Sequence, residues 1–509
     1  MSKILTVEQM SKAEKLSEKY GVSLSDLMDN AALSLCKEIT KIAYNKNLRN
    51  ILILVGNGNN GGDGLVCANT LISNSFNVRL VLMQGQPKTE LSKNAFLNLD
   101  KNADIVPSND AEAQIEWADI VVDAVFGTGF HGDLPDEVKQ FFAKVNKSES
   151  IKIACDLPSG VNAKNGFVSQ GTIKCDYTVC FHALKLGLLL SPAKEFCGEV
   201  TTVDITIPKQ TENELDFEIK RLNKAFIKKL LPYRPDNAHK GTFGKLLCVC
   251  GCSEYRGAAA ISTTAALRSG VGIVNLCSVN NVISSLSCGM YEAIYTELES
   301  DENGFISKNN VKKIIDLSKN YNALLIGCGL GKNTGTVSLV KEIIENVEIP
   351  IIIDADGINC LCENINILKN TKAKIILTPH PAEFSRLLGI SVSEFLENRF
   401  NFVTDFCKEY DVTVLSKSVQ SITMSHNNNK IYLSDNGNSA LSKGGSGDLL
   451  AGIIASLIAQ GTEPTSACAA GQFILGHSAD LLSESMSRRS VLARDILEVL
   501  PFVLKEIED

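Results

Sequence analysis

A short stretch near the C-terminus combines glycines with a single acid. Gly444, Gly445 and Gly447 come just before Asp448, and an apolar run typical of a helix follows from Leu449. Glycines let backbone N–H groups approach a phosphate closely, and the start of a helix adds partial positive charge. An acid there can accept the proton of a hydroxyl that attacks a phosphoryl group. Asp448 could instead only cap the helix, but three glycines favour phosphate chemistry.

Four oxygen-bearing side chains in the first half come at or just past the ends of predicted strands. They are Asn60, Asp123, Asp156 and Ser159. In a parallel sheet the carboxyl ends of the strands form the binding crevice, so these groups should converge there. Each has a structural alternative, since Asp156 could cap the turn before Pro158 and Asp123 could hold a neighbouring loop. The set as a whole favours a joint functional role.

A glycine-rich loop is predicted at residues 56–64. It lies between a buried strand at 51–55 and a helix predicted from Leu65. Strand, glycine loop and helix is the dinucleotide-binding arrangement, and the first, third and sixth residues fit G-x-G-x-x-G. The strand at 78–82 is not followed by the acid that would hold an adenosine ribose. An ordinary dehydrogenase site is therefore disfavoured.

The elements that must position these residues form an α/β pattern. Strands alternate with helices along the chain, which predicts parallel, doubly wound sheets. A length of 509 residues permits two large domains, and the polar, acidic segment 208–218 indicates their boundary. A net charge of −8 without a basic stripe argues against nucleic acid. With no secretion signal and no run of about 18 apolar residues, we expect a cytoplasmic protein without membrane spans.

The 16 cysteines could suggest disulfides or zinc. The clusters Cys248, Cys250, Cys252 and Cys360, Cys362 are spaced C-x-C within apolar runs. Alternate residues of a strand share a face, so these are predicted to be core thiols. The spacing is wrong for structural zinc sites. A reduced, cytoplasmic protein fits best.

Several segments of the first half form one specific pattern. They are residues 55–64, 123–129, 156–160 and 181–187. In these segments the chain resembles the NAD(P)H-hydrate epimerase domain, which implies a Rossmann-like doubly wound domain over residues 1–212. The resemblance also implies a potassium ion held by Asn60, Asp123 and Ser159, whose hard oxygens suit such a cation. It implies proton transfer by Asp156.

The same resemblance implies substrate contacts in the first half. These residues are Asn59, Asn60, Gly61, Gly62, Asp63, Gly127, Thr128, Gly129, Phe130, His131, Gly132, Asp133 and Asp156. Lys185 is either an electrostatic helper or an exposed structural lysine. The family often has a basic residue near His131 and Gly132, and this chain lacks it, which leaves the details of that loop open.

A second set of segments follows in the other half. They are residues 239–241, 327–331, 354–359, 378–383 and 444–452. Together they resemble the nucleotide-dependent NAD(P)H-hydrate dehydratase of the ribokinase-like superfamily, which implies an α/β/α domain over residues 222–509. The resemblance implies Asp448 as the catalytic base and Mg²⁺ with ADP or ATP. Asp354 and Asp356 could touch metal or brace the following helix.

Two groups of contacts follow from this second resemblance. The substrate-binding residues are Gly329, His380, Pro381, Ala382, Glu383, Phe384, Ser385, Arg386 and Asp448. The nucleotide-binding residues are Lys417, Ser418, Val419, Gln420, Ser421, Asn438, Ser439, Lys443, Gly444, Gly445, Ser446 and Gly447. The chain departs from the family at 417–421, where Lys-Gly-Ala-x-Thr is usual, and at 438–441, where Asn-Pro-Gly-Met is usual.

The two resemblances together imply a bifunctional repair enzyme. It would interconvert the R and S epimers of hydrated NADH and NADPH and dehydrate the S form at the expense of ADP or ATP, releasing phosphate. The fused layout favours ADP, and a homo-oligomer is expected. Two alternatives stay open: a small-molecule kinase of the same superfamily, which would leave a stable phosphorylated product, and a nucleotide-binding scaffold whose first half binds partner proteins.

Overall fold

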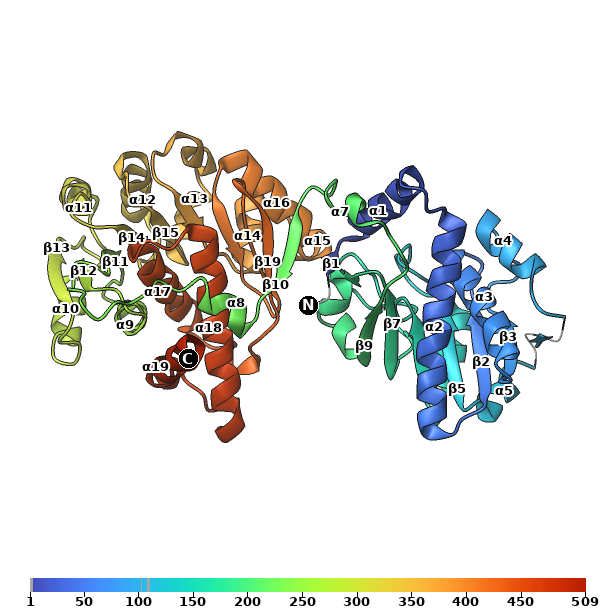
Figure 1. The fold of residues 1–509 in the computed structure, drawn as a ribbon. Coiled ribbons are helices and arrows are strands. Elements are labelled where there is room, and N and C mark those ends of the chain that lie inside the picture. The colour runs from blue at the N-terminus through green and yellow to red at the C-terminus, as the bar shows by residue number, and fades with distance from the viewer. Residues whose placement is uncertain (1–2, 102, 108–109) are drawn as a thin grey trace. The chain divides into compact units, whose positions relative to one another are not determined.

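The structure is a computed structural model that describes residues 3–101, 103–107 and 110–509. Tertiary contacts divide the chain into two compact units, Met1–Ile219 and Lys220–Asp509. Both units are built from α/β layers (Figure 1), which confirms the predicted fold class. A search of the described helices finds none that is both long enough and apolar enough to cross a membrane.

The first unit is organised around a seven-stranded sheet in the order β4-β3-β2-β5-β6-β7-β9, and every pair of neighbours is parallel. The strands are β2 (Asn50–Val55), β3 (Asn77–Leu82), β4 (Asp104–Ile105), β5 (Ile120–Ala124), β6 (Ile151–Cys155), β7 (Tyr177–Phe181) and β9 (Glu199–Val203). The helices are α1 (Val7–Lys19), α2 (Leu24–Lys46), α3 (Asn59–Ser73), α4 (Glu90–Leu97), α5 (Ala113–Trp117), α6 (Asp136–Val145) and α7 (Lys209–Glu212). Short strands β1 (Ile4–Leu5) and β8 (Leu184–Lys185) pair in parallel, and Ile219 of β10 (Glu218–Arg221) pairs antiparallel with Ile4.

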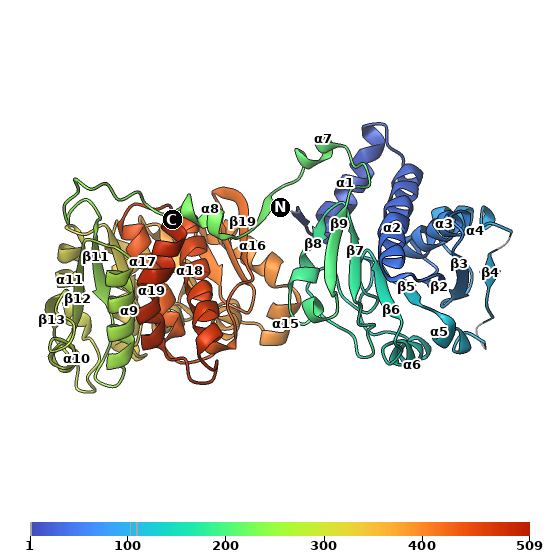
Figure 2. The ribbon, with the colours of Figure 1, turned by 60° about the horizontal axis from the view of Figure 1, so that its bottom comes forward.

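Both faces of this first sheet are covered by helices. Ile51 and Ile53 belong to the core cluster that includes α2 and α3, whereas Leu52 and Leu54 belong to the cluster that includes α5 and α6. Figure 2 shows α2 on one side of the sheet and α5 and α6 on the other. A parallel sheet buried on both faces needs strands that are apolar throughout, which explains the continuous apolar run of β2.

The predicted glycine loop at residues 56–64 is mostly helical. Helix α3 begins at Asn59 rather than at the predicted Leu65. The glycines permit close packing of this first turn: a Cβ at Gly61 would lie 2.0 Å from the Gly56 carbonyl oxygen, and a Cβ at Gly64 would lie 2.7 Å from the Ala124 Cβ. The prediction was wrong here because glycines needed for backbone packing were taken as a turn signal.

The second unit contains a larger sheet in the order β13-β12-β11-β14-β15-β16-β17-β18-β19. Neighbours from β13 to β17 are parallel, and β18 and β19 add antiparallel strands. The strands are β11 (Lys245–Val249), β12 (Ile273–Val279), β13 (Ile294–Leu298), β14 (Ala323–Ile326), β15 (Ile351–Ile353), β16 (Ile375–Leu377), β17 (Thr413–Ser416), β18 (Ser421–Ser425) and β19 (Asn428–Ser434).

Helices cover both faces of the second sheet (Figure 1). On one side lie α9 (Arg256–Arg268), α17 (Ser446–Ala459), α18 (Pro464–Ser485) and α19 (Ala493–Glu508), and on the other α11 (Val311–Ser318), α12 (Thr334–Asn346), α13 (Asp356–Leu361), α14 (Pro381–Leu388) and α16 (Arg399–Tyr410). The remaining helices are α8 (Lys224–Lys228), α10 (Asn280–Leu286) and α15 (Val392–Glu397). Helix α17 packs closely on α9, since a Cβ at Gly452 would lie 2.2 Å from the Ser262 carbonyl oxygen.

The clustered cysteines lie mostly in the core. Cys248, Cys250, Cys252 and Cys360 are buried, Cys362 is half-buried, and none of them forms a disulfide. Burial raises the pKa of the Cys248 thiol well above its ordinary value. This placement confirms that these thiols pack as small core side chains.

Candidate active sites

The end of β5 brings two predicted ligand residues into contact in the first unit. The Asp123 carboxylate accepts hydrogen bonds from the Ser159 backbone N–H and hydroxyl, both at 2.6 Å, and from the Val125 N–H at 3.2 Å. Asp123 and Ser159 are fully buried. Burial raises the pKa of Asp123 to about 6, although the Ser159 hydrogen bonds lower it. Asn60 is also buried, and its Nδ2 has no hydrogen-bond partner in the described structure.

The end of β6 holds Asp156 in an unusual backbone conformation. Its φ is +67°, in the left-handed region that non-glycine residues rarely adopt. The carboxylate accepts a hydrogen bond from the Phe181 N–H at 2.9 Å and forms an ion pair with Lys185. The Lys185 ammonium also donates to the Phe181 carbonyl at 2.9 Å. Lys185 is 1% exposed, so it is a buried counter-ion and not an exposed structural lysine.

A cavity of about 230 Å³ opens over this ion pair. Asp156, Lys185, Asp63 and Glu14 line it together with apolar side chains of α2. Burial raises the pKa of Glu14 to about 6, and the Asp156 charge adds to that effect. Burial also raises the pKa of Asp63 well above its ordinary value, again with a contribution from Asp156. The cavity therefore combines one ion-paired carboxylate with two carboxyl groups that hold protons more tightly than usual.

A second cavity in this unit, of about 490 Å³, takes in most of the other predicted substrate contacts. Its lining includes Asn59, Asn60, Gly127, Thr128, Gly129, Phe130, His131 and Asp133. Asn59, Asn60, Gly127 and Thr128 line both cavities. Gly61, Gly62 and Gly132 are absent from the described lining of either cavity. Gly62 instead faces Met28, whose Cε would lie 2.7 Å from an added Cβ.

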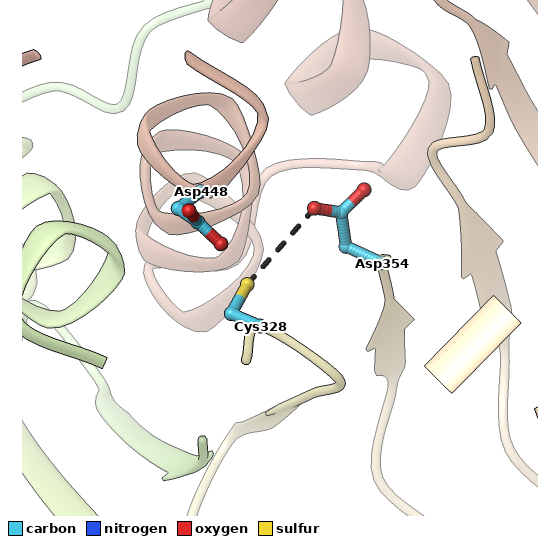
Figure 3. A group of neighbouring side chains, drawn as sticks. All are labelled: Cys328, Asp354 and Asp448. Carbon is cyan, nitrogen blue, oxygen red and sulfur yellow. Dashed lines mark hydrogen bonds between the residues drawn. The ribbon is translucent and has the colours of Figure 1, made fainter. Parts of the chain in front are cut away.

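Three side chains converge at the start of α17 in the second unit (Figure 3). Asp448 extends from α17, Asp354 follows β15, and Cys328 follows β14, and their ligand atoms lie within 4.8 Å of one another. The Asp354 carboxylate accepts from the Thr378 hydroxyl at 2.6 Å, and the Cys328 thiol lies 4.0 Å from its other oxygen. Burial and the neighbouring Asp354 charge raise the pKa of Asp448 to about 6, although Cys328 and Lys417 lower it.

Lys417 provides the positive charge of this cluster. Its ammonium lies 2.8 Å from the Asp354 carboxylate and 4.0 Å from that of Glu383. Burial lowers the pKa of Lys417, but the Asp354 and Glu383 charges outweigh this effect and raise it overall. Burial raises the pKa of Glu383 to about 7. The ammonium also lies 3.4 Å from where a Cβ on Gly447 would stand, so it faces the glycine-rich turn.

The glycine-rich turn places unpaired backbone donors next to Asp448. Gly445 precedes the helix with a φ of +95°, and the first intrahelical bond runs from the Leu449 N–H to the Gly445 carbonyl. The N–H groups of Gly447 and Asp448 therefore have no partner within the helix. Free donors at the start of a helix of 14 residues form a site suited to phosphate.

The other predicted residues of the second unit divide between surface and core. The His380 side chain is 49% exposed and caps α14, and its partial burial lowers its pKa. Phe384 is fully buried and packs edge-on against Phe395 and Phe406, so its side chain belongs to the core, and its assignment to substrate binding stays a prediction. Gly329 has a φ of +62° and packs against the start of α9.

The nucleotide-binding segments are held largely by internal bonds. The Asn438 amide bonds to the Asp480 carboxylate at 2.8 Å and to the Ala440 N–H at 3.0 Å. The Lys443 ammonium donates to the Val491 carbonyl at 2.7 Å. In the turn 418–421, Val419 is 69% exposed, whereas Gln420 and Ser421 are buried.

Three residues of these sites were not predicted from the sequence: Glu14, Thr378 and Cys328. Glu14 lies in α1 among inward-facing residues, and an acid within that apolar stripe was the available signal. Thr378 and Cys328 gain their positions from the pairing of β14, β15 and β16, for which the sequence carries no separate signal. Asp356, in contrast, accepts from the Gly331 N–H at 2.8 Å, so it braces the neighbouring loop.

Comparison with known proteins gives a consistent result for both units. A family model described as NAD(P)H-hydrate dehydratase matches residues 246–502, and one described as YjeF-related protein N-terminus matches residues 24–187. A bifunctional NAD(P)H-hydrate repair enzyme from Moorella thermoacetica is 32% identical over 516 residues, covering 99% of this chain and 97% of the relative.

Solved structures match the second unit. A Streptococcus mutans protein of undescribed function is 29% identical, with a TM-score of 0.50, and covers 57% of this chain and 100% of its own. An ADP/ATP-dependent NAD(P)H-hydrate dehydratase from Bacillus subtilis, co-crystallised with ATP and Mg²⁺, is 28% identical with a TM-score of 0.49. This match covers 56% of this chain and 98% of the Bacillus protein. On the full-length match to the Moorella enzyme and the two family models, the chain belongs to the family of bifunctional NAD(P)H-hydrate repair enzymes.

Proposed function

We propose that the second unit dehydrates hydrated NADH or NADPH with ADP or ATP as phosphoryl donor, and that the first unit interconverts the epimers of that substrate. One observation carries this proposal: Asp448 stands beside free helix N–H groups and the Lys417–Asp354 ion pair. The matches to the NAD(P)H-hydrate dehydratase family model and to the Moorella repair enzyme support it.

In the second unit the substrate hydroxyl attacks the terminal phosphoryl group. Asp448 accepts the hydroxyl proton, because a carboxyl with a pKa of about 6 is ionised at neutral pH yet basic enough to take a proton. The N–H groups of Gly447 and Asp448 and the Lys417 ammonium stabilise the transferred charge. The ring nitrogen then expels phosphate, and loss of a proton from the adjacent carbon restores the dihydropyridine. Phosphate leaves where hydroxide could not.

Mg²⁺ would arrive with the nucleotide and neutralise charge on its phosphates. The carboxylate oxygens of Asp354 and Asp448 are ligands of the kind that Mg²⁺ prefers, whereas the Cys328 sulfur is too soft for it.

In the first unit, Asp156 would transfer protons, and Lys185 would hold its carboxylate in place through their ion pair. A potassium ion would be held by Asn60, Asp123 and Ser159. These residues fit such an ion because a buried carboxylate needs a positive partner, and no lysine, arginine or histidine of the described residues forms an ion pair with Asp123. Asn60 would contribute its side-chain oxygen, because its unpartnered Nδ2 is a hydrogen-bond donor and cannot bind a cation. Potassium would neutralise the Asp123 charge there.

The test follows the return of dihydronicotinamide absorbance from mixed epimers of hydrated NADH with Mg²⁺ and either ADP or ATP. Full recovery by the wild type, about half by Asp156→Asn and none by Asp448→Asn would support both assignments, since one epimer alone is used by the second unit. No recovery with either nucleotide would refute the dehydratase assignment. Accumulation of a stable phosphorylated product would instead support the small-molecule kinase.

A further inference from the structure

A glutamate on α1 lies in the wall of the epimerase cavity, outside every motif described above. Helix α1 begins with a capping box between Thr6 and Gln9 and buries Met10 and Ala13. Glu14 follows Ala13 and lines the cavity of about 230 Å³. The burial of its neighbours fixes the helix, so the carboxyl group is held at the cavity by a rigid element.

The charged groups around Glu14 come from several elements. Lys15 follows it on α1, Asp63 comes from α3, Asp156 from the end of β6 and Lys185 from β8, and all of them line the same cavity. The described lining residues from α2 are apolar. Lys185 is already paired with Asp156. Glu14 itself forms no hydrogen bond or ion pair with the described residues, so its carboxyl group is free to meet a ligand.

We propose that Glu14 is a second proton-transfer group of the epimerase site, acting from the α1 wall while Asp156 acts from the sheet edge. The inference rests on the proposed epimerisation. Inversion at a carbon that carries a hydroxyl needs a donor where water leaves and an acceptor where water returns, on opposite faces of the ring. A burial-raised pKa of about 6 suits Glu14 as the donor, and the ion pair with Lys185 keeps Asp156 available as the acceptor.

The step balances without any oxidant or reductant. Glu14 gives its proton to the substrate hydroxyl, the carbon–oxygen bond breaks with its electron pair leaving on water, and the ring nitrogen lone pair forms a carbon–nitrogen double bond. Water then adds to the other face, the electron pair returns to nitrogen, and the Asp156 carboxylate takes a proton from the added water. Exchange with solvent restores Glu14, and the reverse direction uses the same groups in opposite order.

The test uses the full chain and one purified epimer, without nucleotide, so that the second unit cannot turn over. Conversion to the other epimer and uptake of oxygen-18 from labelled water are followed together and corrected for the uncatalysed rate. We expect Glu14→Gln to lower kcat by about 100-fold or more with KM changed less than about threefold. The loss of rate above about pH 6 in the wild type should disappear with the carboxyl group, and Glu14→Asp should restore part of the rate.

Glu18→Gln is the matched control, because Glu18 is an exposed acid on the same helix and outside the described cavity lining. It should behave as the wild type. A Glu14→Gln variant with wild-type kcat, or with an unchanged pH profile, would overturn the role of Glu14 and leave epimerisation standing. Failure of the wild type to interconvert the epimers would instead overturn the proposed function, and this inference with it.

Discussion

Replacing the acid at the start of α17 should stabilise the protein while removing its dehydratase activity. Burial and Asp354 raise the pKa of Asp448 from 3.8 to about 6. A tenfold shift in a proton equilibrium corresponds to about 1.4 kcal/mol, so an ionised Asp448 costs the second unit about 3 kcal/mol at neutral pH. Asparagine keeps the shape without the charge. We expect Asp448→Asn to raise the free energy of unfolding by about 1–3 kcal/mol, or Tm by about 2–6 °C.

The sign of this effect depends on pH in a defined way. The pKa of Asp448 is higher in the folded state than in the unfolded state. Between pH 3.8 and about pH 6, the folded protein therefore carries this proton more often than the unfolded chain does. The free-energy cost of an ionised Asp448 is therefore absent below the unfolded pKa, grows as pH rises, and is complete above the folded pKa. The difference in Tm between Asp448→Asn and the wild type should be large near about pH 7.5 and small near about pH 4.

Calorimetry at both pH values, with dehydration assayed in parallel, measures the two consequences. We expect kcat to fall by about 100-fold or more. Glu484→Gln serves as a control, since Glu484 is an exposed acid on α18 and should change neither quantity. A variant that is no more stable than the wild type at neutral pH, or equally stabilised at low pH, would refute the idea that Asp448 is kept at a cost in stability for its function.

Three further predictions concern the first unit. Lys185→Met should destabilise the protein by about 3–5 kcal/mol in urea unfolding, because it leaves the buried Asp156 carboxylate unpaired. Gly61→Ala should lower stability by about 1–3 kcal/mol or more in the same assay, since its Cβ would lie 2.0 Å from the Gly56 carbonyl oxygen. Asp123→Asn should abolish any rise in Tm on replacing choline chloride with potassium chloride, which a thermal scan measures directly.

The sheets and helices could be predicted because their apolar patterns are long and unambiguous. The five-residue apolar run at 51–55 lies within β2, and the run after Asp448 lies within α17. The glycines at 56–64 misled the prediction because a glycine needed for close backbone packing and a glycine needed for a turn look the same in sequence. Contacts from outside the segment, such as that of Gly64 with Ala124, decide between them.

The candidate sites could be predicted where a side chain directly follows a strand. Asp123 is the penultimate residue of β5 and Asp156 follows β6, so each lies at the predicted strand end. The partners of such residues were harder to predict, since Lys417 reaches Asp354 from 63 positions further along the chain. The resemblance placed Lys417 among nucleotide contacts, and that assignment stays a prediction. The ion pair between Lys417 and Asp354 forms because β15, β16 and β17 are neighbours in the sheet. No local sequence pattern predicts that strand order.

Both units use the same electrostatic arrangement, and this gives a final prediction. In each unit a lysine pairs with an aspartate at a strand end, the buried Lys185 with Asp156 and the half-buried Lys417 with Asp354. The charge of each paired aspartate adds to burial in raising the pKa of neighbouring carboxyl groups, Glu14 and Asp63 in the first unit and Asp448 in the second. Asp354→Asn should therefore lower the pKa of Asp448 from about 6, because it removes a nearby negative charge and frees the Lys417 ammonium. The acidic limb of kcat/KM for dehydration should move to lower pH; a limb that stays in place or moves upward would mean that burial alone sets the proton affinity of Asp448.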